Sequence, residues 1–195
     1  AACACRTVLK VEKRWENRSN GLDGIKLKTR YGINTGLMLV GNMGSERRFN
    51  YTVMGDHVNL AARCESACKI FGVYAIVSES TKQQAESTGE FVFRKLGKVR
   101  VKGRNKSAEL YQLVGLSGQL DQSSLSLIKQ FETGLHFYFE RKFNEALAIF
   151  KKLSAKEPKN FHVSEYLNPS LFYAEMCRDL IENPPENDWN GIIER

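Results

Sequence analysis

Apolar and polar positions along the first 115 residues follow helical and strand periods in turn. Residues 4–20 carry apolar side chains on or near one side of a 3.6-residue repeat, which predicts an amphipathic helix. Residues 26–36 and 37–44 read as two strands joined by a hairpin-like turn around Thr35 and Gly36. The chain is therefore expected to begin with a helix that leads into a strand pair.

The remainder of this half continues the alternation. The predicted elements are, in chain order, a basic loop at 45–50, a helix at 57–70, and strands at 73–79, 91–103 and 109–115. The helix is expected to end before Gly72, and Ser80 is expected to open a short further helix with Gln83 as its capping-box partner. Strands that alternate with helices indicate a sheet covered by helices.

Beyond this half the pattern changes. Residues 116–124 read as a polar connector, and residues 125–195 follow a helical pattern throughout. Ala146, Phe150 and Pro158 are spaced as in a tetratricopeptide unit, of which one copy is visible. A single unit cannot bury its own apolar face. We therefore expect a helical hairpin packed on the first domain, with a peptide-binding array as the alternative.

Composition changes this picture little. The 195 residues, 42% hydrophobic and 26% charged, suit one medium domain with an appendage. No apolar run approaches the roughly 20 residues of a membrane span, and the first residues lack the pattern of a signal peptide. We expect a cytoplasmic protein, or the cytoplasmic part of a longer membrane-anchored one. Because the sequence does not start with Met and enters a helix partway, we also expect a fragment.

Charge is distributed unevenly along the chain. Residues 1–114 hold 20 Lys and Arg against 10 Asp and Glu, a net charge of +10, whereas residues 115–195 hold 9 against 12, a net charge of −3. A basic half indicates an anionic ligand or partner. Nucleic acid is the least favoured partner, since no binding motif and no basic run interleaved with aromatic residues is present. A nucleotide, a phosphate or a merely solvated surface explains the same bias.

The five cysteines give no metal-binding pattern. Cys3 and Cys5 form a C-x-C pair, and Cys64 and Cys68 lie four residues apart on the predicted helix. A helical cysteine pair can bind a metal, but no third or fourth ligand lies near it in the sequence. Reduced structural thiols are the expected state.

Two long motifs resemble the C-terminal half of a class III adenylate and guanylate cyclase catalytic domain. They are "RYGINTGLMLVGNMGSERRFNYTVMGDHVNLAARCESA" at 30–67 and "GKVRVKGRNKSAELYQLVG" at 97–115. The tail, with "NPPENDWNGI" at 183–192, resembles a segment that follows this domain in many bacterial cyclases. The resemblance implies an α+β fold: a ferredoxin-like cyclase domain over 1–115, a linker over 116–124, and an α-helical hairpin tail over 125–195.

In this family the 3′-hydroxyl of ATP attacks its own α-phosphate, and pyrophosphate leaves. The resemblance assigns Arg63 to the negative charge that develops on the phosphoryl oxygens, because a guanidinium is a permanent cation with several donors. Asn59, one helical turn earlier, matches the asparagine that orients the ribose. Taken alone, these two residues would read as an asparagine near a helix start and a surface arginine.

The resemblance also assigns substrate contacts. Thr52 matches the position that reads the purine, where enzymes acting on ATP carry Asp or Thr and guanylate cyclases usually carry Cys. Its hydroxyl can accept a hydrogen bond from the adenine amino group, and Val53 offers a backbone carbonyl to the same edge. The Thr variant also resembles a subgroup with reported bicarbonate responsiveness. Lys102, beside Gly103, matches the lysine that contacts the β- and γ-phosphates.

Part of the family's machinery is missing from this sequence. Two aspartates that hold Mg²⁺ or Mn²⁺, and the lysine that partners Thr52, belong to the first half of the domain. Asp23 and Asp56 are isolated and wrongly placed to substitute. The family also builds each active site across a dimer. We therefore expect the partners to be ATP and either a second copy or a complementary cyclase half, and this chain to be inactive alone.

Two function classes follow from these observations. The favoured hypothesis is an adenylate cyclase in cyclic-nucleotide signalling, with this chain supplying the Asn/Arg/Lys half of the active site. The alternative is a degenerate, non-catalytic cyclase fragment that acts as a protein-interaction module through its repeat-like tail.

Overall fold

The computed structural model describes residues 1–19, 28–45, 48–100, 107–158 and 168–194. The elements up to residue 116 are α1 (Ala2–Ser19), β1 (Tyr31–Ile33), β2 (Leu39–Ser45), β3 (Arg48–Met54), α2 (Asp56–Phe71), β4 (Ala75–Ser78), α3 (Glu79–Glu86), β5 (Phe91–Arg100) and β6 (Ala108–Leu116). The tail contains α4 (Gln122–Phe139), α5 (Phe143–Ser154), α6 (Pro169–Glu182) and β7 (Ile193–Glu194).

Five strands form one mixed sheet in the order β1-β4-β6-β5-β7. Strand β1 runs parallel to β4, β6 runs antiparallel to both β4 and β5, and β7 runs parallel to β5. Successive side chains of a strand point to opposite faces. Ile76 accordingly joins one hydrophobic cluster, while its neighbours Ala75 and Val77 join another. The first cluster includes α2 and the tail helices, and the second includes α1 and α3.

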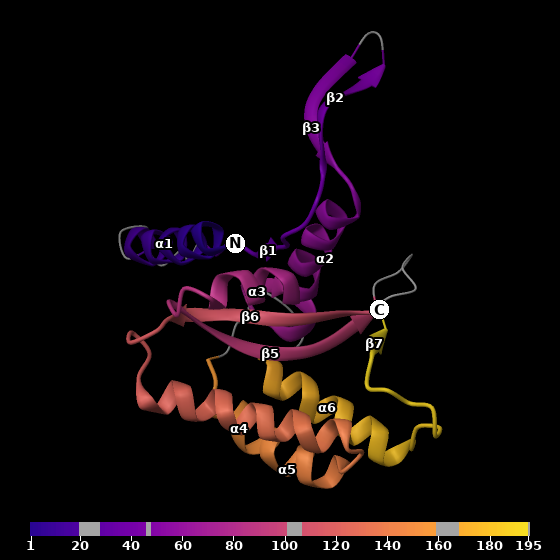
Figure 1. Ribbon diagram of the computed structural model, residues 1–195. Helices are drawn as coiled ribbons and strands as arrows, with labels where there is room; N and C mark the ends of the chain where they lie inside the picture. Colours follow the sequence, from indigo (N-terminus) through magenta and orange to yellow (C-terminus); the bar gives the residue numbers. More distant parts are fainter. Residues whose placement is uncertain (20–27, 46–47, 101–106, 159–167, 195) are drawn as a thin grey trace.

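A separate two-stranded arm projects away from this body (Figure 1). Strands β2 and β3 pair antiparallel from Leu39 with Met54 to Ser45 with Arg48. The hairpin expected around Thr35 and Gly36 is therefore wrong, because β1 pairs in parallel with β4 instead. The basic loop expected over 45–50 is also wrong from Arg48 on. The arm is exposed along most of its length, so it shows no alternation between buried and exposed positions.

Helix ends follow their local chemistry. Helix α2 ends before Gly72 as predicted, and Gly72 adopts a left-handed conformation (φ 64°) that lets its N–H bond to the Cys68 carbonyl. The start of α3 lies two residues earlier than predicted. Ser78, not Ser80, is the N-cap residue, since its side chain accepts a hydrogen bond from the Thr81 N–H.

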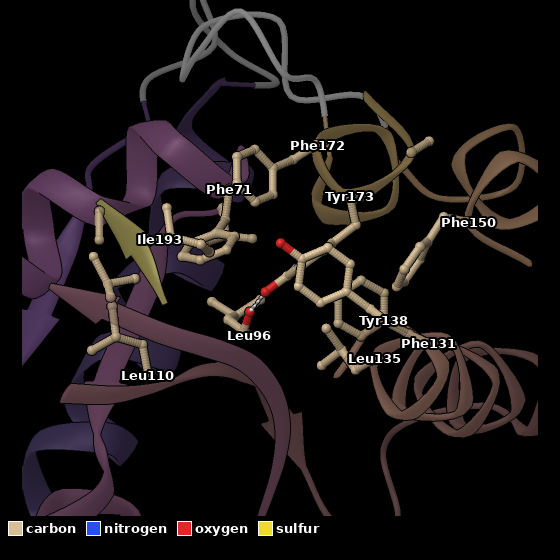
Figure 2. Close-up of a cluster of buried hydrophobic side chains, with 14 of the residues drawn as sticks. Phe71, Leu96, Leu110, Phe131, Leu135, Tyr138, Phe150, Phe172, Tyr173 and Ile193 are labelled. Atoms are coloured by element: carbon tan, nitrogen blue, oxygen red, sulfur yellow. Dashed lines mark hydrogen bonds between the residues drawn. The ribbon is translucent and has the colours of Figure 1, made fainter. Parts of the chain in front are cut away.

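The tail packs on the sheet, as expected, but it contains more than a hairpin. Helix α4 starts at Gln122, inside the predicted connector, because the Asp121 side chain accepts from the Ser124 N–H. The third helix, α6, and the short strand β7 were not predicted as such. In Figure 2, aromatic rings from the tail meet Phe71 of α2 and Leu96 of β5 in one cluster. The tail and the first half thus share a core.

Candidate active site

Helix α2 carries both predicted catalytic residues. It begins directly after Gly55 (φ 140°), whose carbonyl accepts hydrogen bonds from the N–H groups of Val58 and Asn59, each at 3.1 Å. Asn59 and Arg63 are one turn apart, and Asn59 is exposed while Arg63 is half-buried. Neither side chain forms a hydrogen bond or ion pair with the described part of the chain. Within the described residues, the amide and the guanidinium are therefore without a protein partner.

Close packing on strand β1 fixes the position of this helix. A Cβ atom at Gly32 would lie 2.1 Å from the Ala61 carbonyl oxygen and 2.3 Å from the Glu65 nitrogen. Glycine is therefore required for α2 to rest directly on the strand. Arg30 adds an ion pair to Glu65, with 2.7 Å between Nε and Oε1.

A polar network that the sequence pattern did not reveal ties the start of α2 to the sheet. Asn34 donates from Nδ2 to the His57 carbonyl at 2.9 Å and accepts at Oδ1 from the Ser78 hydroxyl at 2.6 Å. The Ser80 hydroxyl donates to the Thr35 carbonyl at 2.9 Å. A Cβ at Gly36 would lie 2.2 Å from the His57 ring. The only sign of this network in the sequence is Gly36, which follows the small polar residues Asn34 and Thr35.

The predicted purine-reading residues lie on the arm. Thr52 pairs across the arm with Gly41, and Val53 pairs with Val40. Both are exposed, and no hydrogen bond within the described residues links them to Asn59 or Arg63. The structure therefore places the two predicted groups on successive elements, β3 and α2, without joining them.

Apolar side chains gather on and beside the same arm. Eight large hydrophobic residues are exposed there: Leu37, Met38, Leu39, Val40, Phe49, Tyr51, Val53 and Met54. Contiguous exposed apolar surface is typical of regions that contact another protein, a membrane or a ligand.

Lys102 lies outside the described residues. The nearest described residue before it is Arg100, the last residue of β5, and this strand pairs with both β6 and β7. Strand β5 therefore ends two residues before Lys102 in the sequence.

The described residues offer no metal site. They contain no cluster of three or more His, Cys, Asp or Glu side chains that could hold an ion. The Cys64 and Cys68 side chains are fully buried, and burial raises the pKa of each thiol to about 12. Cys68 instead donates to the carbonyl oxygens of Tyr31 and Cys64. These cysteines act as protonated core residues.

A cavity of about 850 Å³ lies away from these residues, between α1, the sheet and the tail. Its described lining includes Leu9, Ala75, Leu113, Ile128 and Pro169, and none of Thr52, Val53, Asn59 or Arg63. The cavity is therefore separate from the candidate active site. Within the part of the chain that the structure describes, no helix is long and apolar enough to cross a membrane.

Comparisons with known proteins agree with the cyclase motifs. Over 118 residues the chain is 38% identical to "Adenylate cyclase 1" of Rhizobium meliloti (strain 1021). The aligned region covers 58% of this chain and 17% of that protein. Over 155 residues it is 28% identical to "Adenylate cyclase, terminal-differentiation specific" of Dictyostelium discoideum, covering 77% of this chain and 7% of that protein. The chain thus spans only a small part of these relatives.

Among solved structures, the adenylyl cyclase CyaB from P. aeruginosa is 31% identical, with 58% of this chain and 56% of that chain covered and a TM-score of 0.47. The family model described as "Adenylate and Guanylate cyclase catalytic domain" matches residues 1–115. This match includes β1, the arm, α2 and both long strands of the sheet. The chain therefore belongs to the adenylate and guanylate cyclase catalytic domain family.

Proposed function

We propose that this chain supplies the Asn/Arg/Lys half of an adenylate cyclase active site, which converts ATP into cyclic AMP and pyrophosphate. The observation that carries the proposal is the placement of Asn59 and Arg63. Asn59 is exposed and Arg63 half-buried on a helix that Gly32 seats on the sheet, and neither has a partner among the described residues. Rigid placement is what an orienting group and a charge-stabilising group need.

The proposed reaction assigns a separate role to each side chain. The 3′-oxygen of ATP forms a bond to the α-phosphorus as the bond to pyrophosphate breaks, and the hydroxyl proton passes to solvent water. Arg63 stabilises the charge on the phosphoryl oxygens, and Asn59 orients the ribose so that the 3′-oxygen lies in line. Lys102 contacts the β- and γ-phosphates.

Thr52 and Val53 are proposed to read the purine edge. Because a hydroxyl both donates and accepts, Thr52 favours adenine without excluding guanine. We expect Thr52→Asp to raise the ATP over GTP ratio of kcat/KM and Thr52→Cys to lower it. Equal ratios in the wild type and both variants would mean that Thr52 does not face the purine.

The first half of the site must come from elsewhere. The described residues do not fit the Mg²⁺ or Mn²⁺ that the family's chemistry needs, because no cluster of three or more metal-ligating side chains lies among them. We propose that a first-half catalytic segment supplies the ligands, in a homodimer or a complementary assembly. The division into 1–115, 116–124 and 125–195 belongs to the same proposal. The assembly of both halves is called the intact enzyme below.

The test is the kinetics of the intact enzyme with ATP. Arg63→Ala should lower kcat by about 100-fold or more with little change in KM, the pattern of a contact made mainly in the transition state. Asn59→Ala should also lower kcat. Lys69→Ala is the matched control, since Lys69 is exposed near the other end of the same helix. A tenfold rise in KM at unchanged kcat would reassign Arg63 to substrate binding.

A non-catalytic interaction module is the second candidate. The apolar arm favours it, because a surface of eight exposed hydrophobic residues suits a protein partner whether or not chemistry occurs. The docked tail argues against a module that binds its partner through the tail, because the tail's apolar face already packs on the sheet. An assembly of both halves that forms but makes no cyclic nucleotide would favour the module.

A further inference from the structure

We propose that the helical tail is a positioning element for helix α2, which carries Asn59 and Arg63. Strand β1 fixes the first part of this helix, and the tail packs against its last turn through Phe71. The place of the tail on the sheet therefore affects how α2 is oriented, and with it the two site residues. This inference rests on the proposed function of Asn59 and Arg63.

Strand β1 holds the first part of α2 at close range. A Cβ atom at Gly32 would lie 2.1 Å from the Ala61 carbonyl oxygen and 2.3 Å from the Glu65 nitrogen. The Asn34 amide also donates to the His57 carbonyl, but this hydrogen bond is exposed, so water can replace it. The contact at Gly32 is therefore the point about which a tilt of the helix would occur.

The last turn of α2 packs against helix α6 of the tail. Phe71 is fully buried, and its ring centroid lies 5.2 Å from that of Phe172, with an angle of 73° between the ring planes. The Tyr173 ring lies 6.3 Å from Phe71 at an angle of 28°, and Figure 2 shows the three rings together. Because packed rings keep preferred distances and angles, the position of α6 restricts where the end of α2 can lie.

The tail is itself fixed on the sheet. Three of its parts contact strand β5: the segment after α5, helix α6 and strand β7. Glu157 and Arg94 form a buried ion pair with 2.8 Å between Oε1 and Nη1, and the Tyr173 hydroxyl donates to the Leu96 carbonyl at 2.5 Å. Since each buried charge needs the other, the tail is held in one register on β5.

Tyr173 is also supported by the other two tail helices. Its ring lies 5.8 Å from Phe131 and 5.0 Å from Tyr138, both on α4, and 5.2 Å from Phe150 on α5. All four aromatic residues are almost fully buried. The rings that meet Phe71 therefore belong to a packed core and cannot move away from it freely.

The geometry of a helix indicates how a change at Phe71 reaches the site. At 1.5 Å per residue, Phe71 lies about 12 Å from the Gly32 contact, which is centred near Arg63, and Asn59 lies about 6 Å from it on the other side. A movement of about 1 Å at Phe71 is thus a tilt of about 5° that moves Asn59 by about 0.5 Å. A misplacement of 1 Å can cost about 100-fold in rate, so about tenfold is expected here.

The experiment is Phe172→Leu in the intact enzyme with ATP as the substrate. Leucine keeps the position apolar but removes the ring that lies against Phe71. We expect kcat to fall about tenfold while KM changes less than twofold, because Asn59 is proposed to orient the ribose for attack. An unchanged kcat would overturn the inference.

Two further variants separate positioning from loss of stability. Phe71→Leu removes the same contact from the helix side, so it should lower kcat alike, and the double variant should lower it no further. Phe143→Leu is the matched control, since its ring meets Tyr138 and Trp189 within the tail. It should lower the melting temperature and leave kcat unchanged. An equal fall of kcat in the control would mean general destabilisation and overturn the inference.

Double-mutant cycles test the route through α2. In an Asn59→Ala background, Phe172→Leu should cause no further fall in kcat, because the displaced group is already absent. In an Arg63→Ala background it should still lower kcat about tenfold, since the backbone of Arg63 lies at the point of tilt. Multiplicative effects in both backgrounds would overturn the inference, and so would the reverse pattern.

A measurement on the 195-residue chain distinguishes this inference from the proposed function. Residual dipolar couplings of backbone amides report the angle between α2 and the sheet. Phe172→Leu should change this angle by about 5°, the tilt expected from the helix rise, and Phe143→Leu should not. An unchanged angle would overturn the inference. A changed angle with unchanged kcat in both Phe172→Leu and Asn59→Ala would instead overturn the proposed role of Asn59, on which the inference rests.

Discussion

Gly32 determines, at the level of a single residue, how near helix α2 lies to the sheet. A methyl group there would meet backbone atoms of Ala61 and Glu65, which cannot rotate away as a side chain can. The helix would have to shift as a whole, and Asn59 and Arg63 would shift with it. The sequence alone marks Gly32 only as part of a motif. The requirement for glycine at this position becomes clear only when the helix and the strand are placed together.

Gly32→Ala should therefore affect both stability and activity. Overpacking of this kind destabilises by about 1–3 kcal/mol, and in the intact enzyme kcat should fall if the displaced residues have the transition-state roles proposed above. Urea unfolding and kcat measured on the same preparation check this. Gly89→Ala tests the strain of a left-handed glycine without close neighbours, since nothing lies within 4 Å of its Cβ position and its φ is 67°. If it lowers kcat equally, close packing is not the cause.

The buried thiols predict sensitivity to alkaline pH. Cys64, Cys68 and Cys177 are fully buried, and burial raises each pKa from 9.0 to about 12. Their stabilisation is complete below pH 9, where the unfolded thiols are protonated, and is lost as pH rises toward the folded pKa. At pH 10 each thiol should lower the free energy of unfolding by about 1.4 kcal/mol relative to pH 8.

Urea unfolding at pH 8 and pH 10 measures this effect. Cys68→Ala removes one thiol, so the loss of stability between the two pH values should be smaller than in the wild type by about 1.4 kcal/mol. An identical loss in both proteins would mean that Cys68 does not titrate on unfolding. Cys3→Ala is the matched control because Cys3 is exposed.

At the scale of elements, how well a helix or strand could be predicted depends on whether one of its sides is buried. Helix α2 was predicted within one residue at each end, because its stripe of Cys64, Cys68 and Phe71 is buried on one side only and Gly72 ends it. Strand β3 was missed because its side chains are exposed throughout, so no pattern distinguished it from a loop. The pairing of β1 with β4 was also missed, since parallel partners lie far apart in sequence.

Helix α5 carries the clearest prediction at this scale. Phe143, Ala146 and Phe150 are buried as expected, and Leu147 is partly buried against the same cluster. Leu147→Asn should lower the free energy of unfolding by about 2–5 kcal/mol, the range for losing a large side chain from a core. Chemical denaturation checks this, with exposed Lys151→Asn as the control. Equal stability of the two variants would show that the tail core does not depend on Leu147.

At the scale of the whole molecule, the chain combines a sheet with helices on both faces and an exposed apolar arm that projects from it. Thr52, Val53, Asn59 and Arg63 could be proposed as site residues from the sequence because one long motif contains all four. Their separation onto an arm and a helix could not, since the sequence carries no measure of how far β2 and β3 project. Nor did it show that three parts of the tail contact a single strand.

The purified 195-residue chain should form no measurable cyclic AMP from ATP with either Mg²⁺ or Mn²⁺. The reason is that its described residues contain no cluster of metal-ligating side chains, and the family's reaction needs metal ions. A cyclic AMP assay over a range of enzyme concentrations checks this. Addition of a first-half segment with the metal-binding aspartates should restore activity in proportion to complex formed. Activity of the isolated chain would contradict the half-site proposal.

Strand β7 also affects how the protein can misfold. Its partner residues in β5 are made 94 residues earlier, since Val99 pairs with Ile193. Until Ile193 leaves the ribosome, β5 ends the sheet with unpaired backbone groups that can recruit a strand from another molecule. Chains that stop short of residue 193 should therefore aggregate during synthesis more than their small loss of contacts suggests.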